Sequence, residues 1–477
     1  MAHEATATRR RTFAVATLGC KVNQADSEAI SEQFIAAGYE PCDFAQPADI
    51  YIVNTCTVTH LGDRSSRQLI SQARRRNPDA LLVVTGCYAE VNPQAVAALP
   101  GVDLVVGNRD KDHLLEYIAA SEHGDPNTTP PLARTAACSP RPGKSSLQRW
   151  VLPVLSNPTA IGRDPEPQPD GEPFLIHSRT RVQMKVQDGC DNRCTYCIVP
   201  YARGASRSRS IASVVDHVRR KVALGFKEVV LTGVHLGDYH DGDADLGDLI
   251  RAILEQTDIQ RLRVSSLEPE DFQPHWLDLW ADPRMCRHLH LPLQSGCDAI
   301  LRRMGRRYTT DRYRTIIETA RTRVPGIAIT TDVIVGFPGE TNDHFTTSLR
   351  FVEACHFAKI HVFRFSPRQG TAAARMRDQV PERIKKERST VLLALSDEHG
   401  RQFRRTFLGQ TMDVLWEEEK ESGWEGLTDN YIRVTLISLP GDHQSPERSL
   451  RNRITPVVLR ELTDDGALGE PTSTASE

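Results

Sequence analysis

The sequence predicts an α/β protein with three parts: an N-terminal open parallel α/β sheet domain, a central partial (β/α)6 barrel and a small C-terminal antiparallel β-barrel. Three observations predict this fold class. Short β-rich runs alternate with helix-like stretches over residues 12–107, and the alternation resumes over residues 180–405. After residue 405, short β-like runs are broken by glycine and proline. The 477 residues are enough for two or three domains with sizeable cores.

Composition restricts the class of protein. Charged residues make up 25% of the chain and hydrophobic residues 39%, an ordinary globular balance, and the formal net charge is −3. Because this charge creates no global basic field, a nucleic-acid partner has to be held by local patches. No apolar run of about 18 residues occurs and residues 1–11 lack a signal-peptide pattern, so we expect a cytoplasmic protein with no membrane partner. In that compartment the 11 cysteines are expected to be metal ligands or free thiols rather than disulfides.

The first domain is predicted over residues 12–122. Cys20, Cys56 and Cys87 each follow a candidate strand by a few residues. Because the carboxyl ends of parallel strands meet at one edge of a sheet, these thiols are expected to form a three-thiolate site with an open position. The alternative is three unrelated buried thiols. The candidate strands are residues 12–18, 49–54, 81–85 and 103–106, and the candidate helices are residues 26–37, 63–76 and 93–99.

Residues 123–175 are predicted to be a proline-rich linker. The segment contains prolines at positions 126, 130, 131, 140, 142, 153, 158, 165, 167, 169 and 173. Proline lacks a backbone donor and is disfavoured inside helices and central strands, so no regular element is expected here. Cys138 lies in this segment and is expected to be an incidental thiol.

The central domain is predicted over residues 176–405. Its candidate strands are residues 181–186, 227–231, 261–265, 288–291, 328–335 and 359–363, each followed by a helix-like stretch. Six such units predict a partial parallel barrel, less closed than the eight-stranded form. The active site of this architecture is expected at the carboxyl ends of the strands.

A C-x3-C-x2-C knot of Cys190, Cys194 and Cys197 directly follows the first of these strands. Three closely spaced thiolates suit one soft metal centre. A structural zinc site needs four ligands, usually as two separated C-x2-C pairs, whereas three cysteines on an iron–sulfur cluster leave one iron open for a substrate. The alternatives are a zinc knuckle completed by a histidine such as His177, and three reduced surface thiols.

The knot, with Tyr196 just before its last cysteine, resembles the signature of the radical S-adenosylmethionine (SAM) superfamily. The resemblance implies a [4Fe-4S] cluster on Cys190, Cys194 and Cys197, whose open iron chelates SAM and whose electron cleaves it to a 5′-deoxyadenosyl radical. No catalytic residue is predicted beyond the cluster ligands. The predicted SAM-binding residues, most of them in loops after the strands, are Tyr196, Gly233, Ser265, Glu268, Gln294 and Gly336.

Arginines are frequent in the same loops. Arginine binds phosphate in a bidentate manner, so these side chains are expected either to seat an RNA backbone or to form solvated charges and ion pairs. They are Arg203, Arg207 and Arg209 after the knot, and Arg302, Arg303, Arg306 and Arg307 further along the chain.

The C-terminal part begins with a long basic helix predicted over residues 381–405. Short β-like runs at residues 410–416, 431–436 and 456–461 then predict a small antiparallel barrel within residues 406–463. Residues 464–477 are predicted to be a disordered tail. The barrel resembles the RNA-binding TRAM domain, and Trp424, Tyr431 and Arg433 are its candidate contacts.

The segments around the first three cysteines, residues 19–24, 54–59 and 86–88, closely resemble the N-terminal domain of the radical SAM methylthiotransferases. The resemblance implies an auxiliary [4Fe-4S] cluster on Cys20, Cys56 and Cys87, and therefore two [4Fe-4S] clusters and SAM as cofactors. Residues 17–24, 54–59 and 364–368 resemble the bacterial branch that acts on N6-threonylcarbamoyladenosine at position 37 of tRNA (t6A37).

The implied activity is insertion of a methylthio group at C2 of t6A. The expected partners are tRNA carrying t6A37 and a reductant such as flavodoxin or ferredoxin. Two alternatives stay within the family: isopentenyladenosine in tRNA, and a ribosomal-protein aspartate. A third belongs to another class, a non-catalytic zinc-containing RNA-binding protein.

Overall fold

The structure is a computed structural model of the chain, and it describes residues 10–58, 60–123, 150–151, 180–421, 423–436 and 449–472. The chain forms two compact units. Unit 1 comprises residues 1–176 together with residues 198–205, which the sequence predicts to lie in the central domain. Unit 2 comprises residues 177–197 and 206–477. No helix among the described residues is both long enough and apolar enough to cross a membrane.

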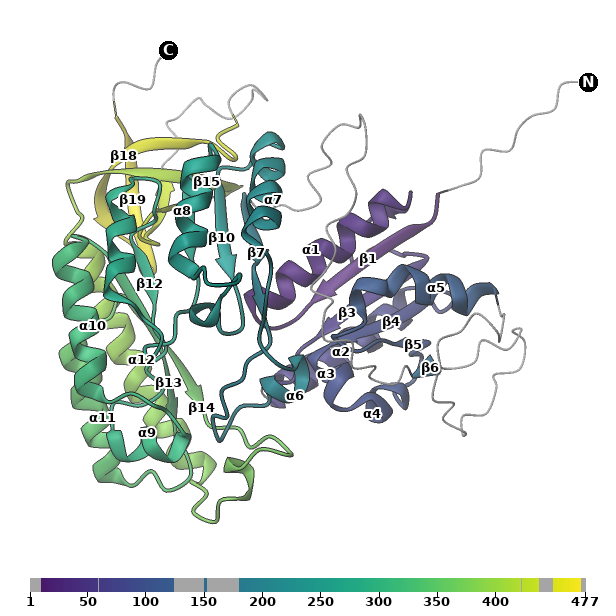
Figure 1. Ribbon diagram of the computed structural model, residues 1–477, viewed down its shortest axis with the longest axis horizontal. Helices are drawn as coiled ribbons and strands as arrows, with labels where there is room; N and C mark the ends of the chain where they lie inside the picture. The colour runs from purple at the N-terminus through teal and green to yellow at the C-terminus, as the bar shows by residue number, and fades with distance from the viewer. Residues whose placement is uncertain are drawn as a thin grey trace, which may run out of the picture. The chain divides into compact units, whose positions relative to one another are not determined.

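Unit 1 is built on one parallel sheet with helices on both faces (Figure 1). Its strands are β1 (Thr12–Thr17), β2 (Glu40–Pro41), β3 (Ile50–Thr55), β4 (Leu81–Gly86), β5 (Leu104–Val105) and β6 (Trp150–Val151), in the order β2-β1-β3-β4-β5-β6. Its helices are α1 (Lys21–Ala36), α2 (His60–Arg76), α3 (Cys87–Val91), α4 (Pro93–Ala97), α5 (Leu114–His123) and α6 (Val199–Arg203).

Two apolar clusters hold the layers of unit 1 together. Phe34 of α1 and Ile118 of α5 pack on one face of the sheet, and Ile70 of α2 and Val96 of α4 pack on the other. Because both faces are covered, the central strand β3 is buried at every residue, as expected for a doubly covered parallel sheet. The predicted open parallel α/β sheet is confirmed.

In its described part, the proline-rich segment forms a strand that the sequence does not predict. Trp150–Val151 forms β6 and pairs in parallel with β5. The other residues from 124 to 175, and therefore most of the predicted linker with Cys138, lie outside the described residues, as does His177.

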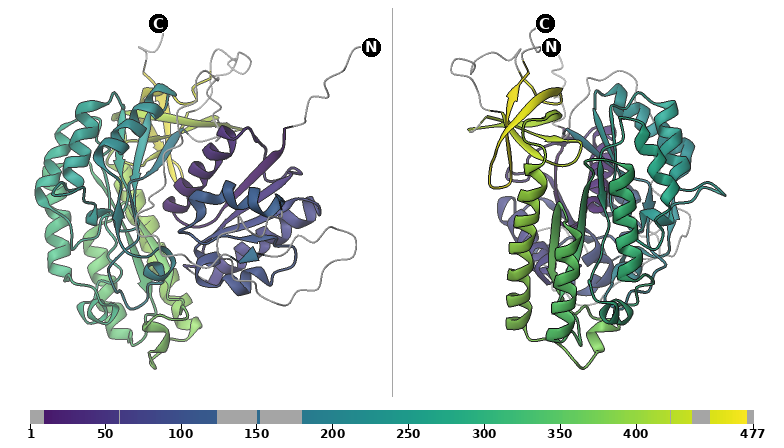
Figure 2. Two further views of the ribbon diagram at one scale, coloured as in Figure 1. Left: turned by 45° about the vertical axis from the view of Figure 1, so that its right-hand side comes forward. Right: turned by 90° about the vertical axis from the view of Figure 1, so that its left-hand side faces the viewer.

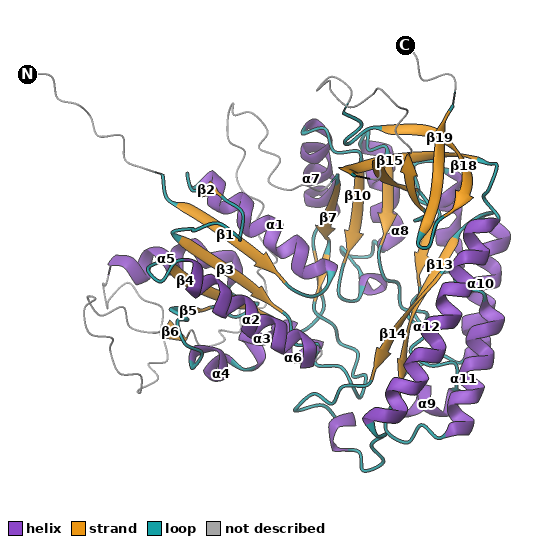
Figure 3. Cartoon of the chain, turned by 180° about the vertical axis from the view of Figure 1, so that it is seen from behind, coloured by secondary structure: helices purple, strands orange, loops and turns teal. Residues whose placement is uncertain are grey.

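Unit 2 contains six parallel strands in chain order (Figures 1 and 3). Strands β7 (Arg181–Lys185), β10 (Glu228–Thr232) and β11 (Arg261–Val264) form one sheet, and β12 (His288–His290), β13 (Ala328–Val335) and β14 (Lys359–Arg364) form another. A bridge between Ser266 and His290 joins the two sheets, so the six strands form the predicted partial barrel. Its helices are α7 (Ile211–Ala223), α8 (Leu246–Gln256), η3 (Pro274–Ala281), α9 (Asp298–Met304), α10 (Thr310–Arg323), α11 (Asn342–Cys355) and α12 (Glu382–Arg405).

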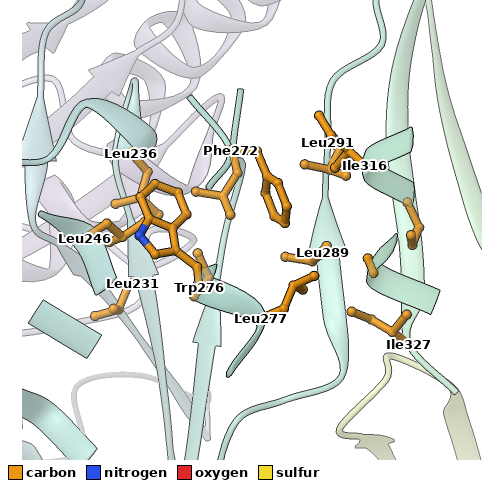
Figure 4. Packing of buried hydrophobic residues seen from close by; sticks show 14 of the residues in the cluster. Leu231, Leu236, Leu246, Phe272, Trp276, Leu277, Leu289, Leu291, Ile316 and Ile327 are labelled. Carbon is orange, nitrogen blue, oxygen red and sulfur yellow. The ribbon is translucent and has the colours of Figure 1, made fainter. Parts of the chain in front are cut away.

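The main core lies between these strands and their helices. Figure 4 shows the Trp276 ring of η3 near Leu231 of β10 and Leu246 of α8. Residues two apart along a strand point to the same side, so the residues that alternate with the apolar ones share the opposite face. That face is polar. This inner face carries, for example, Gln183, Glu228, Arg263, His290 and Asp332.

The C-terminal strands close into a small barrel beyond α12 (Figure 2). The described strands are β15 (Thr411–Lys420), β16 (Gly423–Thr428), β17 (Arg433–Leu436), β18 (Ile454–Leu462) and β19 (Gly466–Pro471). Among them β17 and β19 pair in parallel, and the other pairs are antiparallel. The predicted barrel is therefore present, and the predicted disordered tail from residue 464 is wrong in its first part.

The sequence does not predict β16, where glycines interrupt the β-like runs, or β19, whose residues are assigned to the disordered tail. A Cβ atom on Gly426 would lie 2.5 Å from the Leu415 carbonyl oxygen, and one on Gly466 would lie 2.4 Å from the Arg433 carbonyl oxygen. The strands of this small barrel approach each other too closely for side chains at these positions. These glycines therefore lie inside β16 and β19 rather than in loops.

The barrel packs against the first residues of the parallel strands. Arg261 donates to the Leu427 carbonyl oxygen (3.0 Å), and Arg263 donates to the Asp429 carbonyl oxygen (2.7 Å). The Arg263 guanidinium also lies 4.0 Å from the centre of the Tyr431 ring. Tyr431, predicted as an RNA contact, is therefore engaged inside unit 2.

Removing Arg263 is expected to destabilise unit 2 strongly. Arg263 and Glu228 are both 0% exposed and lie 2.7 Å apart, so an Arg263→Met variant leaves a buried carboxylate without its main partner. Loss of one partner of such a pair costs about 3–5 kcal/mol of unfolding free energy. Chemical denaturation followed by circular dichroism measures the change. The control is Arg251→Gln in the exposed Arg251–Asp248 pair, for which we expect a change within about 0.5 kcal/mol.

The Arg263–Glu228 pair also predicts that the free energy of unfolding decreases at acid pH. Burial raises the pKa of Glu228, but Arg263, Arg181 and Arg261 outweigh it and hold the pKa below its usual range. A depressed folded-state pKa contributes stability above the unfolded carboxyl pKa of about 4.3, and this contribution is lost as the pH falls through the folded value. Chemical denaturation at several acid pH values measures this loss of unfolding free energy. An equal loss in Glu228→Gln and in the parent would contradict this assignment.

Candidate active site

The cysteine knot forms a loop after β8 (Gln187–Asp188), at the carboxyl end of the first barrel strand. Its backbone is fixed from two sides. The Thr195 N–H donates to the Met304 carbonyl oxygen at the end of α9 (2.9 Å), and the Ala373 N–H donates to the Thr195 carbonyl oxygen (2.8 Å). Cys190, Cys194 and Cys197 are half-buried in this loop. The fold therefore holds three thiols at the position where the sequence predicts the active site.

Two of the knot sulfurs face nitrogen groups that are paired with carboxylates. His235 Nδ1 lies 3.7 Å from Cys190 Sγ, and its Nε2 lies 2.5 Å from an Asp271 oxygen. Burial alone lowers the pKa of His235, but hydrogen bonds to Asp271 and Cys190 raise it to about 11. Arg306 donates to Cys194 Sγ (3.3 Å) and forms an ion pair with Glu268. Three sulfur ligands with such donors on two of them fit an iron–sulfur cluster, whose thiolates accept hydrogen bonds.

A cavity of about 590 Å³ opens beside the knot. Its volume lies within the usual range for a small-molecule site, and its wall is polar. The lining residues are Asp191, Asn192, His235, Asp238, Glu270, Asp271, Arg307 and Arg312. Asn192 ties the knot to this wall, because its amide donates to Glu270 (2.7 Å).

The predicted SAM-binding residues after the strands are all in loops at the carboxyl ends. Gly233 follows β10 and has no room for a side chain, since a Cβ would lie 2.9 Å from Gln187 Oε1. Ser265 follows β11 and is buried, and Gln294 follows β12 with a left-handed φ of 62°. Glu268 forms an ion pair with Arg306, and Arg306 in turn donates to Cys194 Sγ of the knot.

Tyr196 and Gly336 belong to a second side of the site. The Tyr196 ring packs edge-on against the ring of Phe337, and the two ring centres lie 6.4 Å apart. Phe337 directly follows Gly336 in the chain. A Cβ on Gly336 would lie 2.3 Å from Lys385 Cγ of α12, so helix packing by itself accounts for this glycine. The SAM contacts therefore stay predictions at the level of single residues.

Sequence reasoning missed polar residues on the inner face of the barrel. His290, Asp332 and His361, from three adjacent strands, bring their ligand atoms within 4.8 Å of one another. The signal was present in the alternation of β12 to β14, where these polar residues share a face opposite the apolar core. The sequence also left the role of Arg306 open between RNA contact and ion pair, and its burial beside Cys194 supports the ion pair.

Unit 1 brings Cys20, Cys56 and Cys87 to one edge of its sheet. Cys20 caps α1 after β1, Cys56 directly follows β3 and Cys87 opens α3 after β4, and these three strands are neighbours. Gly19 lies against Cys56, because a Cβ on Gly19 would lie 2.9 Å from the sulfur. Burial, followed by the neighbouring Cys87 and Cys20, raises the pKa of Cys56 to about 11.

The donor set of this second site also fits an iron–sulfur cluster. It offers three thiols, with Gly19 packed directly against Cys56, and the Asn108 amide donates to Cys87 Sγ (3.3 Å). Cys20 is exposed whereas Cys56 and Cys87 are buried, so the site is open on one side. An open side is what a cluster with one free iron requires.

Comparison with known proteins matches two family models to this chain. The model of the radical SAM superfamily matches residues 184–352, and that of the uncharacterized protein family UPF0004 matches residues 12–107. The threonylcarbamoyladenosine tRNA methylthiotransferase MtaB of Bacillus subtilis is 39% identical over 89% of this chain and 90% of that protein. The protein of that name in Aquifex aeolicus is 37% identical over 88% of this chain and 95% of that protein.

Two more distant matches give context. The tRNA-2-methylthio-N(6)-dimethylallyladenosine synthase of Geobacillus thermodenitrificans is 31% identical over 96% of this chain and 84% of that protein. The fold is similar to that of the radical SAM methyltransferase TsrM of Kitasatospora setae, with a TM-score of 0.55 and 20% identity over 74% of this chain and 73% of that chain. The second likeness shows the fold alone.

Fold, knot and superfamily match together define a radical SAM enzyme. Within this class, the chain belongs to the radical SAM methylthiotransferase family, in the branch of the threonylcarbamoyladenosine tRNA methylthiotransferases. The resemblance seen in the sequence is confirmed. So are the enzyme class, a transferase of sulfur-containing groups, and its cofactors, SAM and two [4Fe-4S] clusters.

Proposed function

We infer that this protein inserts a methylthio group at C2 of t6A37 in tRNA. The observation that carries the inference is 37–39% identity to two threonylcarbamoyladenosine tRNA methylthiotransferases along almost the whole chain. The dimethylallyladenosine enzyme matches over a similar length at lower identity. The t6A substrate is therefore favoured over isopentenyladenosine.

The ligand sets are assigned to two separate tasks. We propose that Cys190, Cys194 and Cys197 hold the cluster that binds SAM, and that Cys20, Cys56 and Cys87 hold the auxiliary cluster. When bound, the first cluster with SAM supplies a carbon radical able to take the inert C2 hydrogen of adenine, and the second supplies the sulfur. The assignment is supported by the position of each triplet at the carboxyl edge of parallel strands.

The side chains around the knot hold and shield its thiolates. Arg306 and His235 direct N–H groups toward Cys194 and Cys190, which favours the thiolate forms that bind metal. Glu268 and Asp271 fix the orientation of these two donors. Tyr196, within the loop, packs its ring edge-on against the buried Phe337.

The remaining partners are proposed from chemistry. The C-terminal barrel is the candidate tRNA-binding module, with Trp424 and Arg433 half-buried on its strands. A low-potential protein such as flavodoxin or ferredoxin is the proposed electron donor. Because both proposed partners are cytoplasmic, we propose the same location for the enzyme.

Deleting the gene is expected to remove 2-methylthio-t6A from total tRNA while leaving t6A itself in place. Mass spectrometry of digested nucleosides measures both, and a plasmid copy of the gene restores the modification. Loss of the 2-methylthio derivative of isopentenyladenosine instead would assign the protein to that branch. Unchanged nucleosides with a missing modification on ribosomal protein would assign it to the aspartate branch.

A further inference from the structure

The segment directly after the knot belongs to unit 1. Residues 198–205 contain α6 and follow Cys197 without a break, yet they pack among the elements that carry Cys20, Cys56 and Cys87. The sequence left Arg203 open between phosphate contact and ion pair. In the structure its side chain is 2% exposed, which rules out a role in seating an RNA backbone.

Arg203 is bound by two residues of α1, the helix that Cys20 caps. Its guanidinium donates to Asp26 (3.0 Å) and to the side-chain oxygen of Asn23. Asp26 is fully buried and also pairs with Lys111. A buried carboxylate with two cations is well compensated, so Arg203 is held firmly in place.

Asn23 links Arg203 to the loops that carry Cys20 and Cys56. A guanidinium only donates hydrogen bonds, so the Asn23 atom that faces it has to be the oxygen. The amide nitrogen then points the other way and donates to the carbonyl oxygens of Leu18 (2.7 Å) and Thr55 (3.0 Å). Leu18 lies two residues before Cys20, and Thr55 directly precedes Cys56.

The third cysteine loop is reached through Asn108. Its amide nitrogen donates to the Ala202 carbonyl oxygen of α6 (3.0 Å) and lies 3.3 Å from Cys87 Sγ. Asn108 is 6% exposed, so this contact is shielded from water. One short helix thus connects to the loops of all three cysteines.

We propose that α6 completes the auxiliary cysteine site and that Arg203 is its positioning residue. Arg203 fixes the Asn23 amide, and that amide holds the loops of Cys20 and Cys56 at the spacing needed to share a ligand with Cys87. The inference rests on the proposed function, in which these three cysteines hold a cluster. It follows that residues 12–122 alone do not make a complete auxiliary site.

The test uses the full chain with Cys190, Cys194 and Cys197 all replaced by alanine, so that only the auxiliary site can hold iron. After anaerobic reconstitution this parent is expected to carry about four irons per chain. Adding Arg203→Gln is expected to lower the content below about one iron and to remove the electron paramagnetic resonance signal of the reduced cluster.

A second variant separates positioning from stability. Asn23→Asp keeps an acceptor for Arg203 but replaces the donor nitrogen with an oxygen, so it loses both bonds to the cysteine loops. Because Asn23 is 1% exposed, the new carboxylate oxygen faces two carbonyl oxygens, and the unfolding temperature is expected to fall. The cluster signal is therefore recorded well below that temperature, where the variant is folded, and we expect it to be lost there. The matched control is Arg74→Gln, which removes another ion pair of unit 1, to Asp103, at the opposite edge of the sheet. It is expected to lower the unfolding temperature and keep about four irons.

The outcomes are distinct. If Arg203→Gln and Asn23→Asp both keep the iron and the signal of the parent, the proposal is overturned. It is also overturned if Arg74→Gln loses iron to the same extent, because general destabilisation would then explain the effect. If the parent itself binds no iron, the assignment of Cys20, Cys56 and Cys87 in the proposed function fails first.

Discussion

Replacing Cys194 with alanine is expected to abolish the formation of 5′-deoxyadenosine from SAM. The variant removes one of three ligands in a loop whose backbone is fixed by α9, so no neighbouring thiol can take its place. We also expect the iron content of anaerobic protein to fall from about eight to about four per chain, because each four-iron cluster is lost as a unit. Chromatography of the reduced reaction with SAM, together with iron analysis, measures both effects.

The control is a cysteine of the same unit without a ligand role. Cys286 is buried in unit 2, and the Cys286→Ala variant is expected to keep both the iron content and 5′-deoxyadenosine formation. If the Cys194 variant still cleaved SAM at the rate of the parent, the knot would not be the SAM-binding centre. A colourless protein with zinc in place of iron would favour the non-catalytic RNA-binding alternative.

Replacing Cys56 with alanine is expected to have the opposite profile. The variant is expected to cleave SAM to 5′-deoxyadenosine but to make no 2-methylthio product on tRNA, because only the sulfur-supplying site is damaged. The iron content is again expected to fall by about four per chain. Liquid chromatography with mass spectrometry follows both products in one reaction.

Cys42 provides the matched control in unit 1. It is half-buried, and its Sγ contacts the Phe13 carbonyl oxygen (3.5 Å) rather than another cysteine. The Cys42→Ala variant is expected to keep both products. Methylthio product from the Cys56 variant would show that the auxiliary triplet is not the source of the sulfur.

The sequence alone determined most of the secondary structure. Each of the six predicted strands of the central barrel coincides with β7, β10, β11, β12, β13 or β14 to within one or two residues at either end. The reason is physical, since buried parallel strands are short apolar runs separated by amphipathic helices, and both patterns are local. The same locality placed Cys20, Cys56 and Cys87 just after strands, and a parallel sheet leaves only one edge for such residues.

Local patterns failed where a distant partner decides. The sequence predicts a break at the glycines of β16 and a disordered tail over β19, but barrel closure places Gly426 and Gly466 where strands approach too closely for side chains. Charge was equally ambiguous, because Arg203 and exposed Arg302 look alike in the sequence. Only the partners Asp26 and Asn23, about 180 positions away along the chain, make Arg203 a buried residue.

The sequence by itself determined the fold class, the two cysteine triplets and the family. The tertiary structure decided which unit owns the segment after the knot, which arginines are buried, and which residues orient the cysteine loops. The physical reason is that residue type and spacing identify a ligand set locally. The hydrogen bonds that hold the ligand loops in position join segments that meet only after folding.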